Sequence, residues 1–244
     1  MKLKATVLLS TLVMSGAVLA QAKAPEPDFT SSLNVGGVTD YRYRGISQSR
    51  GKPAIQGGAD VAHKSGFYIG TWASSIKWIK DGGGDTSAEV DIYGGYKFSS
   101  GDFAFDLGAL RYLYPGSTMG VNPDTTEIYA AGTWGPVTLK YSHAVTNLFG
   151  FSDSDGSYYV DLNATFDTGV WGLAFVPHVG YQKVKSNDAF SYTDWSLTLN
   201  KDFGNGFSAS LAYVDTDTKT YIAPNGKDLG KATAVLGVKY TYAF

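Results

Sequence analysis

The last eleven residues of the chain, "AVLGVKYTYAF" (234–244), alternate between apolar and polar side chains. A period of two is the pattern of a β-strand with two different faces. The apolar row consists of Ala234, Leu236, Val238, Tyr240, Tyr242 and Phe244. This row continues to the last residue, although chain ends usually fray. The stretch therefore predicts a terminal strand that is held at its edges and that lays an aromatic face against apolar surroundings.

The opposite end of the chain has the layout of a secretory signal peptide. Lys2 and Lys4 precede an apolar run at 5–20, and Ala20-Gln21-Ala22 provides an A-x-A-like cleavage site. A membrane-spanning helix is the alternative, but it needs about 20 apolar residues and the run is shorter. We therefore predict that residues 1–22 are removed and that 23–244 form one exported domain, most simply of a bacterium.

The composition narrows the class of protein. The chain has 30 Gly, 17 Tyr, 13 Phe and 5 Trp but no Cys, so neither a disulfide nor a thiolate ligand supports the fold. Charged residues make up 17%, below the usual share of about a quarter. Without Lys2 and Lys4, 18 basic residues face 22 acidic ones, a formal charge of −4. No basic face is indicated, so nucleic acid is not an expected partner.

The same alternation recurs along the mature chain. The predicted strands are 31–44, 53–63, 67–76, 87–98, 103–113, 125–134, 137–146, 157–166, 171–184, 191–203, 207–216 and 231–244. Tight turns such as "KSG" (64–66) and "GNG" (204–206) alternate with longer loops such as "GISQSRGK" (45–52). Twelve strands of about ten residues, with short turns at one end and longer loops at the other, are typical of a transmembrane β-barrel.

A soluble β-sandwich is the alternative for many short strands joined by turns. The positions of the aromatic residues favour the barrel, because they crowd the strand ends beside the tight turns. They include Phe67, Tyr96, Phe98, Phe103, Phe105, Trp134, Phe166, Trp171, Phe203 and Phe207. Such a girdle marks a membrane interface. We expect the last strand to face hydrocarbon and to pair with the first, which leaves no open sheet edge in the lipid. Strand 67–76 is ambiguous, because Phe67 and Ile69 compete with Tyr68 and Trp72 for the lipid face.

Two stretches carry a family resemblance. "TDYRYRGISQSRGKPAIQGGADVAHKSGFYIGTWASSI" (39–76) and "EVDIYGGYKF" (89–98) resemble the outer-membrane porin family labelled TorF, and "YRYRGISQS" (41–49) is the most specific part. The C-terminal Phe244, with apolar residues at alternating positions before it, resembles the assembly signal of bacterial outer-membrane proteins. The resemblance implies a Gram-negative outer-membrane barrel, a pore, and recognition of the last strand by the barrel-assembly machinery.

Motifs for other chemistry are weak. Ser142 and His143 are adjacent on a predicted strand and point to opposite faces, so they cannot form a nucleophile–base pair. "DSDG" (153–156) lacks the remaining ligand positions of a calcium loop, and a solvated surface loop is the better interpretation, with a loose Ca²⁺ contact left open. "GNGFSA" (204–209) joins two strands and therefore predicts a hairpin, not a dinucleotide site. We expect no catalytic residue, no cofactor and no metal site.

The sequence thus predicts an outer-membrane channel for passive diffusion of small hydrophilic solutes or ions, with membrane lipid around it. The alternative is a closed structural barrel that displays its surface loops. The candidate pore-lining residues, all predicted near the outer strand ends, are Arg42, Arg44, Glu89, Asp91, Glu127 and Lys231. Bases on one wall would then face acids on another, and such charges set selectivity when ions pass close to them. Arg42 and Arg44 could instead pair with acids that fill the lumen, or stand as solvated charges in a mouth loop.

Overall fold

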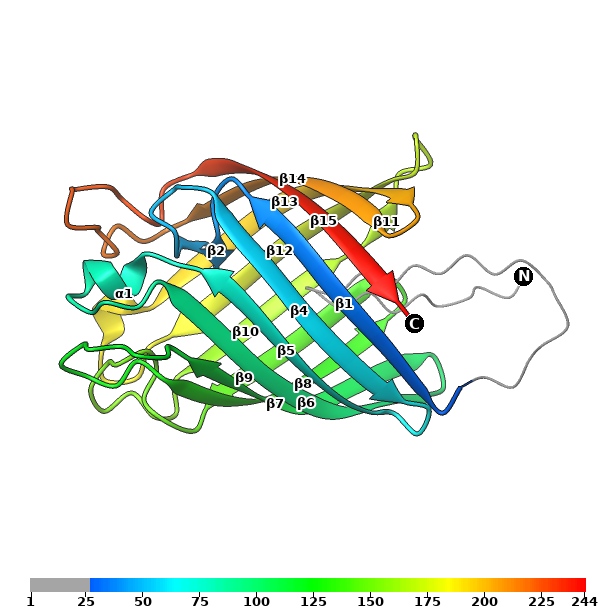
Figure 1. Ribbon diagram of the computed structural model, residues 1–244, viewed down its shortest axis with the longest axis horizontal. Coiled ribbons are helices and arrows are strands. Elements are labelled where there is room, and N and C mark those ends of the chain that lie inside the picture. Colours follow the sequence, from blue (N-terminus) through cyan, green and yellow to red (C-terminus); the bar gives the residue numbers. More distant parts are fainter. Residues whose placement is uncertain (1–26) are drawn as a thin grey trace, which may run out of the picture.

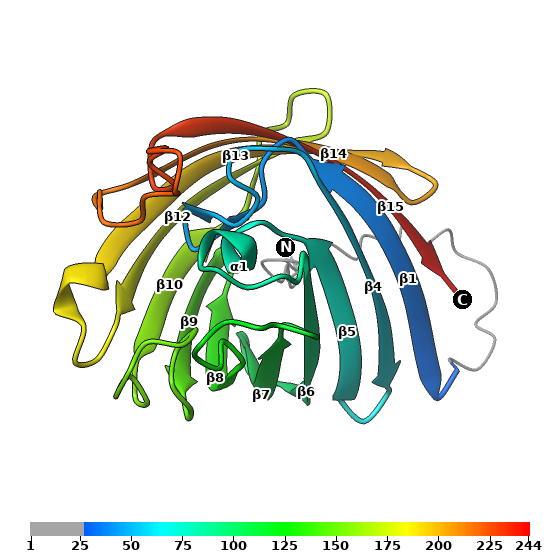
Figure 2. The same cartoon turned by 60° about the vertical axis from the view of Figure 1, so that its left-hand side comes forward.

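One antiparallel sheet closes on itself to form a barrel (Figures 1 and 2). The computed structural model describes residues 27–244, so the predicted signal peptide at 1–22 lies outside the described residues. The wall strands are β1 (Phe29–Val38), β4 (Ala54–His63), β5 (Phe67–Ser75), β6 (Ala88–Ser100), β7 (Phe103–Leu113), β8 (Thr125–Trp134), β9 (Val137–Ala144), β10 (Tyr158–Ala164) continued by β11 (Phe166–Asp167), β12 (Leu173–Lys183), β13 (Tyr192–Gly204), β14 (Phe207–Thr216) and β15 (Thr233–Ala243). With β10 and β11 counted as one interrupted strand, the prediction of a twelve-stranded all-β barrel is confirmed.

The two ends of the sheet meet where β15 pairs with β1. Leu33 stands opposite Tyr242, and Val35 stands opposite Tyr240. Phe244 extends the pairing beyond β15, because its N–H donates to Ser31 O at 2.9 Å and its carbonyl accepts from Ser31 N at 3.1 Å. The last strand is therefore paired to its final residue. Closure satisfies backbone groups that an open edge would leave unpaired in lipid.

An apolar belt surrounds the barrel. Its outward-facing side chains include Leu33, Val35, Ile55, Ile69, Ile92, Leu107, Ile128, Leu139, Leu162, Leu197, Leu211, Leu236 and Val238, all exposed. The structure also decides the ambiguous strand, because Phe67 and Ile69 point outward, 63% and 60% exposed. Soluble proteins rarely expose so continuous an apolar surface. The belt is suited to hydrocarbon, and the sandwich alternative is wrong, because a single closed sheet forms the wall.

The two ends of the barrel differ. At the short-turn end, aromatic rings pack in pairs, as with Phe67 and Tyr96 at 4.8 Å and Phe207 and Tyr240 at 4.6 Å between centroids. At the opposite, long-loop end are six loops: L1 (39–53), L2 (76–87), L3 (114–124), L4 (145–157), L5 (184–191) and L6 (217–232). L2 contains the one-turn helix α1 (Trp78–Asp81), and L5 contains the 3-10 turn η1 (Asp188–Phe190). Within residues 27–244, no helix is long and apolar enough to cross a membrane.

L1 corrects the predicted strand 31–44, which ends at Val38 instead. Asp40 interrupts the ladder, because its Oδ1 accepts from Ser49 Oγ at 3.0 Å and from Gly51 N at 3.1 Å. The chain then forms a short hairpin of β2 (Arg42–Tyr43) and β3 (Ile46–Ser47). The hairpin tip meets the inner wall, since a Cβ on Gly45 would lie 2.6 Å from Thr216 Cγ2 and 2.7 Å from Asp194 Cβ. Gly45 also has a φ of +81°, which favours glycine.

Candidate functional site

Arg44 joins the tip of L1 to the barrel wall. Its Nη2 donates to Glu127 Oε2 on β8 at 2.7 Å, and its Nη1 donates to Gln182 Oε1 on β12 at 2.6 Å. The guanidinium also stacks over the Tyr159 ring, 4.3 Å from the ring centroid. The side chains of Arg44 and Glu127 are 7% and 2% exposed. A buried, charge-assisted pair therefore fixes L1 within the mouth of the barrel.

Arg42 organises L1 against its neighbours. Its Nε donates to Asp40 Oδ2 at 2.6 Å, within the same loop. Its Nη1 donates to Leu229 O of L6 at 2.8 Å, and its Nη2 donates to Thr233 Oγ1 of β15 at 2.8 Å. Arg42 thus connects L1 with L6 and with the closing strand.

Three acidic side chains of β6 and β8 lie buried beneath L1. Glu89 accepts from Tyr41 Oη at 2.6 Å and from Tyr114 Oη at 2.8 Å, one phenol to each carboxylate oxygen. Burial, reinforced by the Glu89 carboxylate, raises the pKa of Tyr41 and Tyr114 well above the ordinary value. Both phenols therefore stay protonated and act as donors. Asp91 Oδ1 and Glu127 Oε1 are buried and have no hydrogen-bond partner among the described residues.

The six residues predicted to line a pore have different positions. Arg44, Glu127, Glu89 and Asp91 lie inside the mouth, and only Arg44 and Glu127 form an ion pair among them. The strand position expected for Arg42 and Arg44 is wrong, because both lie in L1 and not on a wall. Lys231 lies in L6 and is exposed. That these residues line a path for solute stays a prediction.

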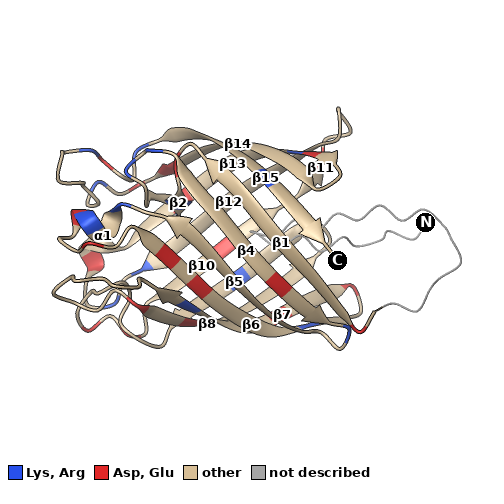
Figure 3. Ribbon diagram, viewed as in Figure 1, with Lys and Arg blue, Asp and Glu red and all other residues tan. Residues whose placement is uncertain are grey.

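A second polar layer lies below L1, and the sequence reasoning did not single it out. Tyr68 Oη donates to Asp106 Oδ1 at 2.6 Å and is also hydrogen-bonded to Tyr129 Oη. Tyr93 Oη donates to Asp60 Oδ1 at 2.6 Å. The sequence could have identified these residues, because they occupy the inward rows of the predicted strands. Acidic segments stand along the walls between the two ends (Figure 3).

His178 occupies a separate part of the inner wall, on β12. Its Nδ1 lies 3.3 Å from Asp161 Oδ2, and its Nε2 lies 2.9 Å from Asp194 Oδ1. Tyr159 Oη also donates to Asp194, at 2.9 Å. These contacts form a polar network between β10, β12 and β13. Among the described residues, no group of three or more His, Cys, Asp or Glu side chains is placed to hold a metal ion.

The Ser142-His143 pair has the geometry expected of neighbours on a strand. Ser142 is 4% exposed and faces inward opposite Tyr159. His143 belongs to the opposite row, and its Nδ1 lies 3.0 Å from Tyr141 Oη. The serine hydroxyl and the imidazole therefore lie on opposite sides of the wall, where they cannot act as nucleophile and base.

Comparison with known families covers nearly the whole chain. The model of the family described as "Bacterial protein of unknown function (Gcw_chp)" matches residues 21–242. The chain belongs to the Gcw_chp family. This family model does not carry the TorF name, so the TorF resemblance stays an interpretation of the sequence. No curated protein matches the chain in sequence.

Solved structures similar to this Gcw_chp protein include porins and an outer-membrane channel. The KdgM porin has a TM-score of 0.57 at 9% identity, over 86% of this chain and 99% of that one. The NanC porin has a TM-score of 0.56 at 14% identity, over 85% and 98%. The COG4313 outer membrane channel from Pseudomonas putida F1 has a TM-score of 0.51 at 14% identity, over 92% and 100%. At these identities, the likeness concerns the fold. The barrel therefore has the fold of these porins and of this channel.

Proposed function

We propose that this protein is a passive channel of the bacterial outer membrane for small hydrophilic solutes or ions, with L1 as its constriction. The observation that carries the proposal is the solvent exposure of the inward-facing lysines. Lys97, Lys140 and Lys239 belong to the inward rows of β6, β9 and β15, yet each remains partly exposed. A charged amine inside the wall keeps that exposure when water reaches it, and this supports a water-filled lumen below L1.

The charge of the lumen bears on the class of solute. Along the inward rows, acids outnumber bases, even with His178 on the wall and Arg44 in the mouth included: Asp60, Glu89, Asp91, Asp106, Glu127, Asp161 and Asp194 stand against Lys97, Lys140, Lys239, His178 and Arg44. One structure of the KdgM porin is described as a complex with disordered oligogalacturonate, which is a polyanion. An acidic lumen repels such a solute, so we propose neutral solutes and cations for this channel.

The alternative function is a closed structural barrel that displays its loops. It is favoured by the contacts at the mouth, where Arg44 is paired with Glu127 and both oxygens of Glu89 are occupied. A mouth that L1 closed completely would pass no solute. The two functions differ in one measurable property, which is conductance.

The test is reconstitution of the refolded mature chain in a planar bilayer. Heat-modifiable migration on a gel first establishes that each preparation is folded. We expect discrete ohmic steps for the unmodified chain and larger steps for Arg44→Ala, because L1 then loses its contacts with β8 and β12. Arg111→Ala is the matched control, since Arg111 is 39% exposed and pairs with Asp124 at the outer rim. No conductance from folded protein, with or without Arg44, would leave the structural barrel as the function.

A further inference from the structure

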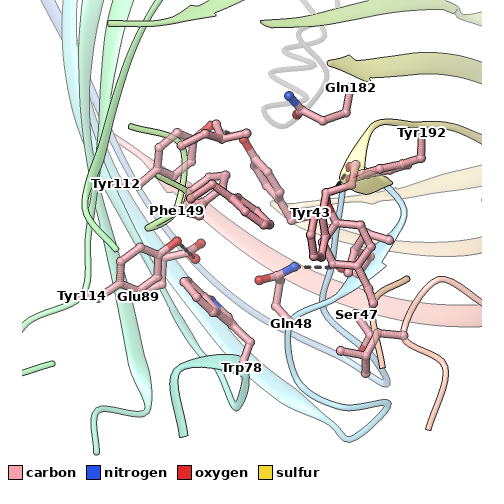
Figure 4. Close-up of a pocket in the computed structure, with 16 residues that line it drawn as sticks. Tyr43, Ser47, Gln48, Trp78, Glu89, Tyr112, Tyr114, Phe149, Gln182 and Tyr192 are labelled. Atoms are coloured by element: carbon pink, nitrogen blue, oxygen red, sulfur yellow. Dashed lines mark hydrogen bonds between the residues drawn. The ribbon is translucent and has the colours of Figure 1, made fainter. Parts of the chain in front are cut away.

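A cavity of about 200 Å³ lies at the long-loop end, where all six loops converge. Each loop contributes a lining residue: Tyr43 from L1, Trp78 from L2, Tyr114 from L3, Phe149 from L4, Phe190 from L5 and Tyr221 from L6. The wall adds Tyr112, Gln182, Tyr192 and Glu89. Rings from opposite sides of the barrel thus face one space (Figure 4).

The size of the cavity suits one ring. An apolar cavity of about 150 Å³ is large enough to hold benzene. The rings that line this cavity already pack edge to face, as Trp78 and Tyr114 do at 4.9 Å and Tyr43 and Phe149 do at 5.5 Å between centroids. A further aromatic ring gains energy in both edge-to-face and offset-stacked arrangements. Aromatic walls on several sides therefore favour a flat, single-ring solute.

The polar groups of the lining are mostly engaged with the protein itself. Tyr114 Oη donates to Glu89, and Tyr221 Oη donates to Phe190 O at 2.8 Å. Gln182 uses its amide oxygen for Arg44 and its amide nitrogen for Tyr158 O at 3.0 Å. Trp78 differs, because its indole Nε1 is buried and has no hydrogen-bond partner among the described residues. A ligand acceptor beside this N–H would satisfy a buried donor that the protein leaves unpaired.

The charge of the lining decides between ligands of similar size. Among the described residues, no Lys or Arg lines the cavity, and Glu89 is the only acidic residue that does. An anion would therefore meet a carboxylate without a compensating base. A cation would stack well on the rings, but it would bring only donors to the unpartnered indole N–H. A neutral ligand with one acceptor satisfies both conditions.

We propose that this cavity binds a small neutral compound with one aromatic ring and one hydrogen-bond acceptor, and that the Trp78 indole turns its N–H toward this acceptor when the compound binds. The site is built by the loops, so binding does not require that the barrel conducts. Because L1 and L2 both line the cavity, a bound ring would also hold the loops of the mouth together.

The test uses the full mature chain, refolded in detergent and checked by heat-modifiable migration. Saturation-transfer NMR titrations compare benzamide, which is neutral and has an acceptor, with toluene, benzoate and benzylammonium. We expect benzamide to bind most tightly of the four. Trp78→Phe keeps an aromatic ring but removes the donor. The affinity for benzamide should therefore fall about two- to tenfold, while the affinity for toluene changes by less than about twofold.

A second variant separates the cavity from partitioning into detergent. Gln48→Trp places a larger side chain in the lining and keeps the backbone hydrogen bonds of residue 48. The affinities for benzamide and for toluene should both fall at least about tenfold. Unchanged binding in folded Gln48→Trp would overturn the proposal, because the ligand would then reside elsewhere. Equal weakening of toluene and benzamide by Trp78→Phe would overturn it too. So would tighter binding of benzoate or of benzylammonium, or no binding of benzamide to the unmodified chain.

Discussion

Arg44 is the residue whose side chain decides where L1 lies. It contacts two strands and two aromatic rings, while the hairpin that carries it is only two residues long on each side. A buried charge that loses its partner is strongly destabilising, by about 3–5 kcal/mol, whereas replacement of both partners by apolar groups is often neutral. Among the described residues, Glu127 already has one oxygen without a partner, so the loss of Arg44 would leave its buried carboxylate with only Tyr112 Oη, 3.3 Å from Oε2, as a donor.

The variant Arg44→Met should therefore release L1. Limited trypsin digestion of the folded barrel measures this, because Arg42 and Arg50 in L1 are largely covered in the unmodified chain. We expect cleavage within 39–53 to become at least about tenfold faster. A tenfold change corresponds to a decrease of about 1.4 kcal/mol in the free energy of opening L1. The double variant Arg44→Met with Glu127→Leu should recover much of the protection. Equal cleavage rates for Arg44→Met and for the surface control Arg111→Met would contradict this role.

At the scale of elements, period-two alternation predicted most of the wall but not L1. Tyr41 and Tyr43 alternate with Arg42 and Arg44 as strand residues do, so the first strand was predicted to continue to residue 44. The difference depends on non-local contacts, because Arg44 adopts a φ of +46° in a turn that closes against β13 and β14. Strand 67–76 was ambiguous for a related reason, since tyrosine and tryptophan suit a membrane interface as well as a polar lumen.

The assignment of rows in β14 gives a direct test of which face meets lipid. Leu211 lies mid-strand and is 46% exposed on the outer face, whereas its neighbour Ser210 faces inward beside Gly237, where there is little side chain to displace. Leu211→Arg should reduce the free energy of unfolding from lipid vesicles by about 2–4 kcal/mol. Ser210→Arg is the matched control and should change it by less than about 1 kcal/mol. The reverse order in a denaturant titration would mean that the faces are exchanged.

At the scale of the whole molecule, the barrel was easier to predict from the sequence than the site. Each strand could be found locally, and Phe244 indicated closure against the first strand. The cavity could not be found in this way, because Tyr43 and Tyr221 come together only after closure places L1 beside L6. The pairing of Arg44 with Glu127 likewise spans 83 positions of sequence. Local alternation contains no information on such contacts.

The net charge of the lumen gives a prediction for the complete barrel. Asp60 and Asp106 face inward below L1, and each accepts from a tyrosine, so Asn in their place keeps an acceptor and removes a charge. In a salt gradient, we expect the unmodified channel to prefer cations. The Asp60→Asn, Asp106→Asn double variant should lower the cation-to-anion permeability ratio by about twofold or more.

The control for that change removes two negative charges outside the lumen. Asp85→Asn with Asp102→Asn alters exposed residues of L2 and of a short turn, and it should leave the reversal potential nearly unchanged. The effect of the inner pair should weaken with added salt, since charges in a wet pore are screened over about 8–10 Å at ordinary ionic strength. Equal shifts from the two double variants would indicate that the surface field sets the preference. An unmoved reversal potential in both would show that ions pass far from Asp60 and Asp106.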